Sequence, residues 1–478
     1  MSSRRKAIIL VSCCLSLLIV SMDATIVNVA IPSIRADLNA SASQIQWVID
    51  IYTLVLASLL LLSGATGDRF GRRRTFQIGL TVFAVGSLMC SLAPNIETLI
   101  AARFLQAIGG SMMNPIAMSI ITQVFTGRVE RARAIGIWGG VVGISMALGP
   151  IVGGALIQYV DWRAVFWINL PICAVAIVLT AIFVPESKSA TMRDVDPVGQ
   201  GLGMAFLFGL VYVLIEGPNF GWTDIRMIGV ALAAVLALIG FLAYESRRHD
   251  PFIDLRFFRS IPFASATMIA VCAFAAWGAF LFMMSLYLQE ERGFSAMNTG
   301  LIYLPVAIGA LVFSPLSGRM VGRFGGRPSI VIAGTLITTA AVLLATLTAS
   351  TPVWQLLVIF AVFGIGFSMV NAPITTAAVS GMPTDRAGAA SAVASTSRQV
   401  GVSLGVALCG SVAGSALVTK GADFAVAARV LWLICAVLGL TIVALGIYST
   451  SARGLRSADR LAPLIAGTDT RREGADVR

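Results

Sequence analysis

The chain alternates long apolar runs with short polar connections from one end to the other. A helix needs about 20 apolar residues to cross the hydrocarbon core of a bilayer. Runs of this length are expected as membrane spans at fourteen places, near residues 7–29, 44–63, 75–93, 97–121, 133–158, 164–184, 199–217, 227–244, 263–288, 299–318, 328–349, 353–376, 391–418 and 428–449. The pattern predicts an all-α polytopic membrane protein in which no connection is long enough to form a domain of its own.

Composition and charge agree with this prediction. The chain is 57% hydrophobic and 12% charged, which excludes an ordinary soluble protein. A net charge of +11 could indicate a protein that binds nucleic acid, but the distribution of the positive residues between the two sides of the membrane indicates otherwise. With the amino terminus inside, only six of the 34 Lys and Arg residues fall in outer loops, namely Arg35, Arg163, Arg226, Arg292, Lys420 and Arg429. This positive-inside bias predicts a multi-pass protein of the inner (cytoplasmic) membrane with both termini cytoplasmic and no nucleic-acid partner.

The sequence shows no residue pattern that indicates a bound cofactor or a catalytic site. All seven cysteines fall in apolar runs, so we expect core residues and no disulfide framework. No nucleotide-binding loop, metal-ligand cluster or nucleophile–base set occurs in the spans, so we expect no cofactor, no metal and no enzymatic activity. The single histidine, His249, falls in an inner loop. Carboxylates would therefore have to carry any proton through the membrane.

A loop rich in glycine and arginine occurs twice. It follows the second span at Gly64–Arg74 and returns after the tenth span at Gly318–Arg327. A second pair of similar segments lies at 108–114 and 365–371, Ile-Gly-Gly-Ser-Met-Met-Asn and Ile-Gly-Phe-Ser-Met-Val-Asn. Internally duplicated membrane proteins are typically transporters whose substrate site lies between the repeats.

The repeat divides the chain into four parts. We expect an amino-terminal six-helix bundle over residues 1–184 and a second one over 263–450. Residues 185–262 would hold two linkers and an inserted pair of helices, the seventh and eighth spans. Residues 451–478 are polar and are expected to form a disordered cytoplasmic tail.

Ionisable residues are rare in the spans, so each is a functional candidate. Asp23, Asp50 and Arg103 are expected on three different helices at one level, roughly 9 Å below the outer ends at a rise of 1.5 Å per residue. An Asp23–Arg103 pair would offset the burial of both charges, and protonation of the aspartate would release the arginine. These three residues are the proton-coupling candidates. Alternatively, the pair only fixes helix packing, and Asp50 caps a helix start.

A polar stripe continues from Arg103 along the same helix. Gln106, Gly110 and Asn114 follow at a spacing close to 3.6 residues and are expected to face a wet central cavity. Asn371 is the counterpart of Asn114 in the second half, and Arg398 lies in the thirteenth span. The candidates for a substrate cavity are Gln106, Gly110, Asn114, Asn371 and Arg398. For Arg398, a structural contact with backbone carbonyls is an equal alternative.

Two segments are candidates for moving parts. In the fifth span, Gly143, Gly149 and Pro150 would allow bending, since proline removes a backbone hydrogen bond, although plain close packing explains them too. In the first copy of the loop, glycines allow a sharp turn and Asp68 could latch neighbouring helix ends with two arginines. The gating candidates of this loop are Gly64, Asp68, Arg69, Gly71 and Arg72.

These motifs together resemble the major facilitator superfamily, and within it the fourteen-helix drug:proton antiporters of the EmrB/QacA type. The resemblance spans residues 7–450, and the four matching motifs are Asp23–Pro32, Gly64–Arg74, Arg103–Gly110 and Gly143–Gly154. It implies two six-helix bundles plus two inserted helices. It also implies proton coupling by Asp23 and Arg103, an inner gate at Asp68 and bending at Gly143–Pro150. The second loop departs from the pattern, because Gly322 stands where Asp68 stands in the first.

The resulting hypothesis is an exporter that exchanges protons for a small lipophilic drug or natural product by alternating access in the lipid bilayer. One alternative is an importer or facilitator of a small metabolite. Another is a membrane sensor or assembly partner that transports nothing. The sequence does not predict the oligomeric state, the compound or its charge.

Overall fold

The computed structural model describes residues 2–187, 196–248, 253–380, 387–413, 422–458 and 460. The predicted disordered tail from 461 onward and most of the first linker lie outside these residues. Within them the chain forms helices and no strand, which confirms the all-α prediction. Ser2 caps the first helix, and Ser41 with Gln44 makes a capping box at the start of the second.

The first half contains seven helices in chain order. They are α1 (Ser3–Asp37), α2 (Ala42–Phe70), α3 (Arg72–Ser91), α4 (Ile96–Val124), α5 (Arg128–Tyr159), α6 (Ala164–Trp167) and α7 (Asn169–Phe183). The short α6 and the longer α7 together occupy the place of the sixth predicted span. Two helices follow, α8 (Pro197–Phe220) and α9 (Ile225–Arg247), and they lie at the seventh and eighth predicted spans.

The second half also contains seven helices. Its helices are α10 (Ile261–Leu286), α11 (Ala296–Ile302), α12 (Leu304–Phe324), α13 (Gly326–Leu344), α14 (Val353–Val379), α15 (Ala387–Ala413) and α16 (Ala422–Ser449). A 3-10 turn, η1 (Leu255–Arg259), precedes α10, and a π turn, η2 (Tyr287–Glu291), follows it. Here α11 and α12 together occupy the place of one predicted span, the tenth.

Helices stand at all fourteen predicted positions, but they are not equally apolar. In the described part of the chain, eleven are long and apolar enough to cross a membrane. The other three are α3 and α15, which are less apolar, and α5, whose described residues form a shorter apolar stretch over Leu148–Tyr159. The first of these begins with three arginines, and α15 is rich in small and polar residues, which lowers the mean hydropathy of both. The protein is therefore an all-helical, multi-pass membrane protein by its helices, while a count of fourteen spans remains a prediction.

Both copies of the repeated loop make the same turn. Gly71 links α2 directly to α3 with a φ of 111°, and Gly325 links α12 to α13 with a φ of 78°. Positive φ is open to glycine at little cost, and it is strained for other residues. The two loops thus have equivalent backbone turns, as the sequence repeat predicts.

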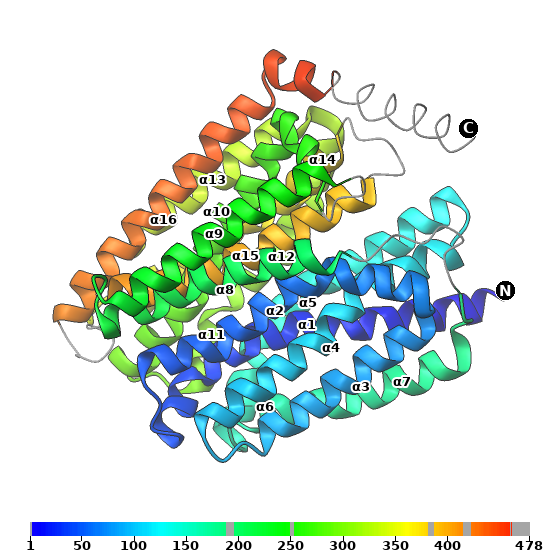
Figure 1. Cartoon of the computed structure of the whole chain (residues 1–478). Coiled ribbons are helices and arrows are strands. Elements are labelled where there is room, and N and C mark those ends of the chain that lie inside the picture. Colours follow the sequence, from blue (N-terminus) through cyan, green and yellow to red (C-terminus); the bar gives the residue numbers. More distant parts are fainter. Residues whose placement is uncertain are drawn as a thin grey trace.

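The helices pack in two groups, one formed by α1–α7 and the other by α10–α16. We call the side at which α1 begins and α16 ends the terminal face, and the other side the opposite face. Figure 1 shows that the two groups converge toward the opposite face and diverge toward the terminal face. The pair α8 and α9 packs side by side, and α8 contacts one helix of each group, α2 and α15.

The contacts between the two groups concentrate near the opposite face. The Arg35 guanidinium lies 3.0 Å from the Glu290 carboxylate, and Gln289 donates a 3.0 Å hydrogen bond to the carbonyl of Val29. Between α5 and α11 the backbones approach so closely that a Cβ on Gly300 would stand 2.4 Å from the carbonyl oxygen of Pro150. The groups are therefore locked together on this side.

Toward the terminal face, three glycines of α5 and α12 have open space beside them. A Cβ built on Gly140 of α5, or on Gly318 or Gly322 of α12, would meet no described atom within 4 Å. These glycines lie in the halves of α5 and α12 that are nearer the terminal face. The two groups are thus in closest contact toward the opposite face, and their helices diverge toward the terminal face.

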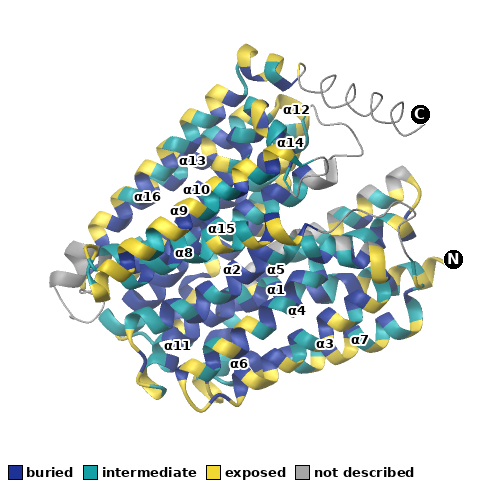
Figure 2. Ribbon diagram, viewed as in Figure 1, coloured by how far each residue is buried: buried dark blue, intermediate teal, exposed yellow. Residues whose placement is uncertain are grey.

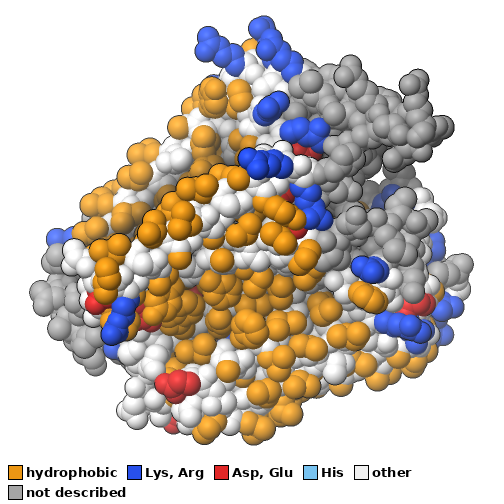
Figure 3. All heavy atoms as spheres, in the orientation of Figure 1, with side chains coloured by type: hydrophobic (Ala, Val, Ile, Leu, Met, Phe, Trp, Pro, Cys, Tyr) orange, Lys and Arg blue, Asp and Glu red, His pale blue; other side chains and the backbone are white. Residues whose placement is uncertain are grey.

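The outer surface is suited to hydrocarbon. Burial is greatest where helices face one another, and α8, α9 and α16 show long exposed stretches (Figure 2). On α9 the exposed side chains include Ile225, Leu232 and Leu236, which are 80%, 58% and 58% exposed. Figure 3 shows hydrophobic side chains over this surface, with lysine and arginine gathered mainly toward the terminal face. Such a band is typical of a membrane protein.

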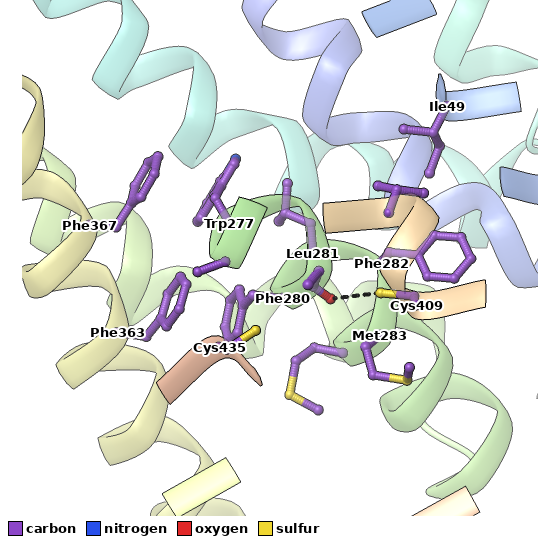
Figure 4. Packing of buried hydrophobic residues seen from close by; sticks show 14 of the residues in the cluster. Ile49, Trp277, Phe280, Leu281, Phe282, Met283, Phe363, Phe367, Cys409 and Cys435 are labelled. Atoms are coloured by element: carbon purple, nitrogen blue, oxygen red, sulfur yellow. Dashed lines mark hydrogen bonds between the residues drawn. The ribbon is translucent and has the colours of Figure 1, made fainter. Parts of the chain in front are cut away.

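The second half has an aromatic core. Trp277 and Phe280 of α10 stack against Phe363 of α14, and Phe367 lies against Trp277 with ring centroids 4.5 Å apart (Figure 4). Cys409 lies beside this cluster with its thiol facing the carbonyl of Ala279. All seven cysteines are free and six are buried, as expected for small core residues.

Candidate functional site

Asp23 of α1 and Arg103 of α4 form an ion pair in the core of the first half. The Arg103 Nη1 lies 2.5 Å from Asp23 Oδ2, and the two side chains are 1% and 0% exposed. The sequence predicts them at one depth, and the structure brings them into contact. An ion pair that is buried away from water is stable only if further hydrogen bonds satisfy both charged groups.

Further hydrogen bonds match both charges. The other carboxylate oxygen of Asp23 accepts from Gln106 Nε2 at 2.9 Å and from Asn169 Nδ2 at 3.2 Å. Arg103 also donates to Gln106 Oε1 at 2.7 Å and to the carbonyl of Val48 at 3.1 Å, and its guanidinium lies 4.1 Å from the centre of the Tyr52 ring. The pair is therefore the centre of a polar network rather than an isolated contact.

Two members of this network were not predicted from the sequence. Asn169 is the first residue of α7, and Ser87 lies on α3; both are completely buried. The Ser87 hydroxyl oxygen accepts from Gln106 Nε2 at 2.8 Å and from Asn169 Nδ2 at 3.3 Å. Each is a polar residue within an apolar span, and nothing else in the sequence distinguishes it. The network thus joins α1, α3, α4 and α7.

The polar stripe of α4 is covered over part of its length. Gln106 is 0% exposed and belongs to the ion-pair network. Gly110 is buried as well, and a Cβ there would stand 3.2 Å from the Leu56 side chain. Asn114, one turn farther on, is half-buried. In this conformation other residues cover Gln106 and Gly110, because helical spacing defines a face but does not say whether water or another helix covers it; a substrate cavity along the stripe stays a prediction.

Asp50 points away from the ion pair. Its side chain is completely buried between α2 and α15, and neither carboxylate oxygen has a hydrogen-bond partner among the described residues. The hydroxyls of Thr53 and Ser403 lie beside it without the geometry of a hydrogen bond. The alternative of a helix cap is wrong, because Ser41 caps α2 and Asp50 lies well inside that helix. Asp50 therefore sits at the contact between the two halves.

Arg398 of α15 contacts α14 and α10. Its Nη2 donates to the Thr375 hydroxyl at 2.7 Å, and its guanidinium lies 6.0 Å from the centre of the Phe274 ring. No contact of Arg398 with a backbone carbonyl occurs among the described residues, so that alternative finds no support. Asn371, one turn before Thr375 on α14, is half-buried. These two cavity candidates of the second half therefore lie close together.

The first copy of the loop is held by an acidic residue that the sequence did not single out. Glu186, just after α7, accepts from the backbone N–H of Arg73 at 3.1 Å and lies 3.7 Å from Arg74. The Glu186 carboxylate lies against Gly71, where a Cβ would stand 2.5 Å from it, so a side chain at this position would have to displace Glu186. The segment after α7 therefore fastens the turn between α2 and α3.

The predicted latch can be placed only in part. The side chain of Asp68 lies outside the described residues. Arg69 is exposed, and Arg72 lies 3.4 Å from Gln123 Oε1 on α4. Gly64 packs beside Pro115 of α4, with 3.7 Å between the two Cβ positions. These contacts hold α2 and α3 against α4 near the terminal face.

In the fifth helix the glycines serve close packing. A Cβ on Gly149 would stand 2.0 Å from the Thr25 hydroxyl of α1, and one on Gly154 would stand 2.5 Å from the Ala296 carbonyl oxygen of α11. The helix continues through Pro150, which is buried. The side-chain position at Gly143 lies outside the described residues. Close packing is thus present, and bending remains a prediction.

The chain has recognisable relatives. The model of the family described as the Major Facilitator Superfamily matches residues 13–406. A tetracenomycin C resistance and export protein of Streptomyces glaucescens is 37% identical over 85% of this chain and 76% of that protein. A methylenomycin A resistance protein of Bacillus subtilis (strain 168) is 32% identical over 90% of this chain and 94% of that protein.

A solved structure shares the fold. The crystal structure of a bacterial homologue of the human lysosomal transporter Spinster covers 97% of both chains with a TM-score of 0.63. Its sequence is 18% identical, so the likeness concerns the arrangement of helices alone. The arrangement in two packed helix groups is therefore shared with a solved transporter.

Proposed function

Because this chain belongs to the Major Facilitator Superfamily, we propose that it exports a small lipophilic drug or natural product in exchange for protons. The names of its relatives support export and resistance, and a membrane transporter needs no enzymatic activity. The observation that carries the proton coupling is the completely buried ion pair of Asp23 and Arg103. A carboxylate in the membrane core is expected to serve a proton or an ion pathway.

The coupling would work through the network around Asp23. A proton that binds the carboxylate removes the negative charge that Arg103, Gln106 and Asn169 now satisfy. The guanidinium would then lack its counter-charge at a site of low dielectric, which is costly. A movement of α1 relative to α4 and α7 would relieve this cost. Protonation is thereby linked to a change in how the first half packs.

The orientation follows from charge. Lysine and arginine gather toward the terminal face, so we assign this face to the cytoplasm and place both termini there. The two helix groups then diverge toward the cytoplasm and are held together on the outer side by contacts such as Arg35–Glu290. This is the conformation in which an exporter of the inner membrane takes up its substrate.

The membrane potential can supply the free energy for export. One charge that moves through 100 mV of membrane potential is worth about 2.3 kcal/mol, before any pH gradient is counted. A second proton would add as much. We assign that second site to Asp50, because a buried carboxylate without a partner is costly in its charged form. Its position between α2 and α15 would make the contact of the two halves sensitive to protonation.

The domain organisation fits alternating access. We assign residues 1–184 and 263–450 to the two moving bundles, residues 185–262 to the linkers and the inserted pair, and residues 451–478 to a cytoplasmic tail. This arrangement corresponds to the fourteen-helix drug:proton antiporters. The loop around Asp68 would then gate the cytoplasmic side, and α5 would bend near Pro150.

The proposal is tested with purified protein in liposomes that contain a pH-sensitive dye. Addition of tetracenomycin C or methylenomycin A should move protons in the wild type, and Asp23→Asn should abolish this movement while it leaves the protein folded. Asp37→Asn is the matched control, because Asp37 ends the same helix and pairs with Arg163 at 2.9 Å. Proton movement that ignores both compounds and survives Asp23→Asn would overturn the coupling.

A further inference from the structure

Arg398 is a half-buried charged side chain of the second half, and among the described residues it has no charged partner. It lies eleven residues into α15, roughly 16 Å along the helix at 1.5 Å per residue. Its recorded polar contact is the Thr375 hydroxyl at 2.7 Å, and its Nε has no hydrogen-bond partner among the described residues. No described carboxylate lies within 4.0 Å of its guanidinium.

This situation contrasts with the other arginine of the spans. Arg103 is held by a carboxylate, an amide oxygen and a backbone carbonyl. A cation in the membrane core without such matching is costly, and the charged residues found there typically line a substrate or ion pathway. A negative charge supplied by a bound molecule would offset the cost at Arg398.

The groups around Arg398 are suited to an acidic compound. Asn371 and Thr375 lie four residues apart on α14, so their side chains share one face of the helix. Thr375 is exposed and Asn371 is half-buried; the Asn371 amide can donate a hydrogen bond to an oxygen, and the Thr375 hydroxyl, which now donates to the Asn371 backbone carbonyl at 3.1 Å, can turn to do the same. A guanidinium binds a carboxylate through two parallel N–H groups, and the two neighbours would add to the same recognition.

The surface next to Arg398 is aromatic. Phe274 lies beside the guanidinium and is half-buried, and its ring meets the edge of Phe367 with centroids 5.0 Å apart. Phe367 in turn stacks on Trp277. A planar aromatic compound with its acidic group on Arg398 could lie against the ring of Phe274, which packs on the buried Phe367.

We propose that Arg398, Asn371, Thr375 and Phe274 form a binding site for the acidic end of a planar aromatic compound, so that this chain exports organic anions. The inference rests on the proposed export function and adds the class of its substrate. The carboxylates at mid-depth in the first half, Asp23 and Asp50, are both 0% exposed and offer no site for a cation in this conformation. A membrane potential that is negative inside also favours the exit of an anion.

The test measures binding without any proton gradient. The probe is 9-anthracenecarboxylate, and its neutral counterpart is 9-anthracenecarboxamide, which has the same ring system. The affinity of purified wild-type protein for each is measured by fluorescence. We expect the carboxylate to bind at least tenfold more tightly than the amide. Arg398→Gln should remove this preference, and Arg398→Lys should retain part of it, because lysine keeps the charge but not the paired donors.

The matched control is Arg453→Gln, since Arg453 is exposed beyond α16 and its loss changes the net charge equally. Thr375→Val should lower the affinity for the carboxylate several-fold and leave the affinity for the amide unchanged. It provides a second variant should Arg398→Gln fail to fold. Equal binding of both compounds by the wild type, or a preference for the carboxylate that survives Arg398→Gln, would overturn the proposal. Neither result depends on whether protons drive export, so the two proposals can fail separately.

Discussion

Phe360 occupies in α14 the position that Arg103 occupies in α4. The two residues are 257 positions apart, the same offset that relates Ile108 to Ile365 in the repeated segment. Arg103 meets Asp23 of α1, and Phe360 meets Phe280 of α10 with ring centroids 4.8 Å apart. One half thus has an ion pair where the other has two aromatic rings. The titratable chemistry of this position is confined to the first half.

This asymmetry predicts different consequences for two matched substitutions. Asp23→Asn should abolish compound-driven proton movement. Phe280→Leu should cost about 1–3 kcal/mol of stability through lost packing and leave the number of protons moved per compound unchanged. Thermal unfolding and the liposome assay measure the two effects in parallel. Loss of proton movement in a folded Phe280→Leu protein would contradict the assignment of proton coupling to the first half alone.

Asn169 should tune the pH dependence of exchange. Its amide donates to the Asp23 carboxylate at 3.2 Å, and such a bond stabilises the charged form. Removal of the donor in Asn169→Ala favours the protonated carboxyl. The pH at which compound-driven proton movement is half-maximal should therefore shift upward.

The control for this shift is Asn219→Ala. Asn219 donates to Glu216 at 2.9 Å near the opposite face, far along the chain from the network. Its substitution should leave the pH profile in place. An Asn169→Ala protein with reduced activity but an unchanged profile would limit Asn169 to a structural role.

Depth along a helix could be predicted from the sequence, and rotation about it could not. Asp23, Asp50 and Arg103 were placed on one level, yet only two of them meet. On α2, Val48 and Tyr52 contact Arg103, whereas Asp50 and Gln46 face α15. Residues four apart share a face, so the split follows helical geometry once the neighbours are known. The neighbours are a property of the packing and are not written in a single sequence.

The repeat allowed more to be predicted. The turn glycines Gly71 and Gly325 have positive φ in both copies, as the glycine pattern indicated. The partner of the first loop, Glu186, was missed because it lies in the connection after α7, where nothing in the sequence distinguishes it from other polar residues. The family was recognised from the order of four motifs, while the fourteen-helix subtype and the roles of the site residues stay predictions.

Closure of the opposite face depends on glycine at the contact of α5 with α11. Gly300→Leu should force these helices apart, because a Cβ alone would stand 2.4 Å from the Pro150 carbonyl oxygen. The protein should then favour the outward-open state. Val29, now 0% exposed, reports on this: a cysteine there should react several-fold faster with a membrane-impermeant maleimide. The background needs the native cysteines replaced.

The matched control for closure is Gly229→Leu on α9. A Cβ at this position meets nothing within 4 Å, so the larger side chain should change neither labelling nor transport. Equal labelling of the Val29 cysteine in wild type and Gly300→Leu would show that the α5–α11 contact does not close the outer side.

The inserted pair should move with the first half. α8 is hydrogen-bonded to α2 at two levels, since Trp47 Nε1 donates to Glu216 at 3.0 Å and Gln200 Nε2 donates to the Ser58 carbonyl at 3.0 Å. Toward α15 the recorded contact is apolar, in a cluster that includes Val211 and Ala407. Hydrogen bonds define one relative position, whereas apolar surfaces can slide.

Two cysteine cross-links can test which of the two contacts of α8 stays fixed during transport. One joins α8 to α2 through Val211→Cys and Leu54→Cys, and the other joins α8 to α15 through Val211→Cys and Ala407→Cys; all three positions lie in one buried cluster. We expect the first link to leave transport within about twofold of the reduced protein and the second to lower it at least tenfold, because it would tie the two halves together. Reduction should restore the second. The opposite pattern would assign α8 and α9 to the second half.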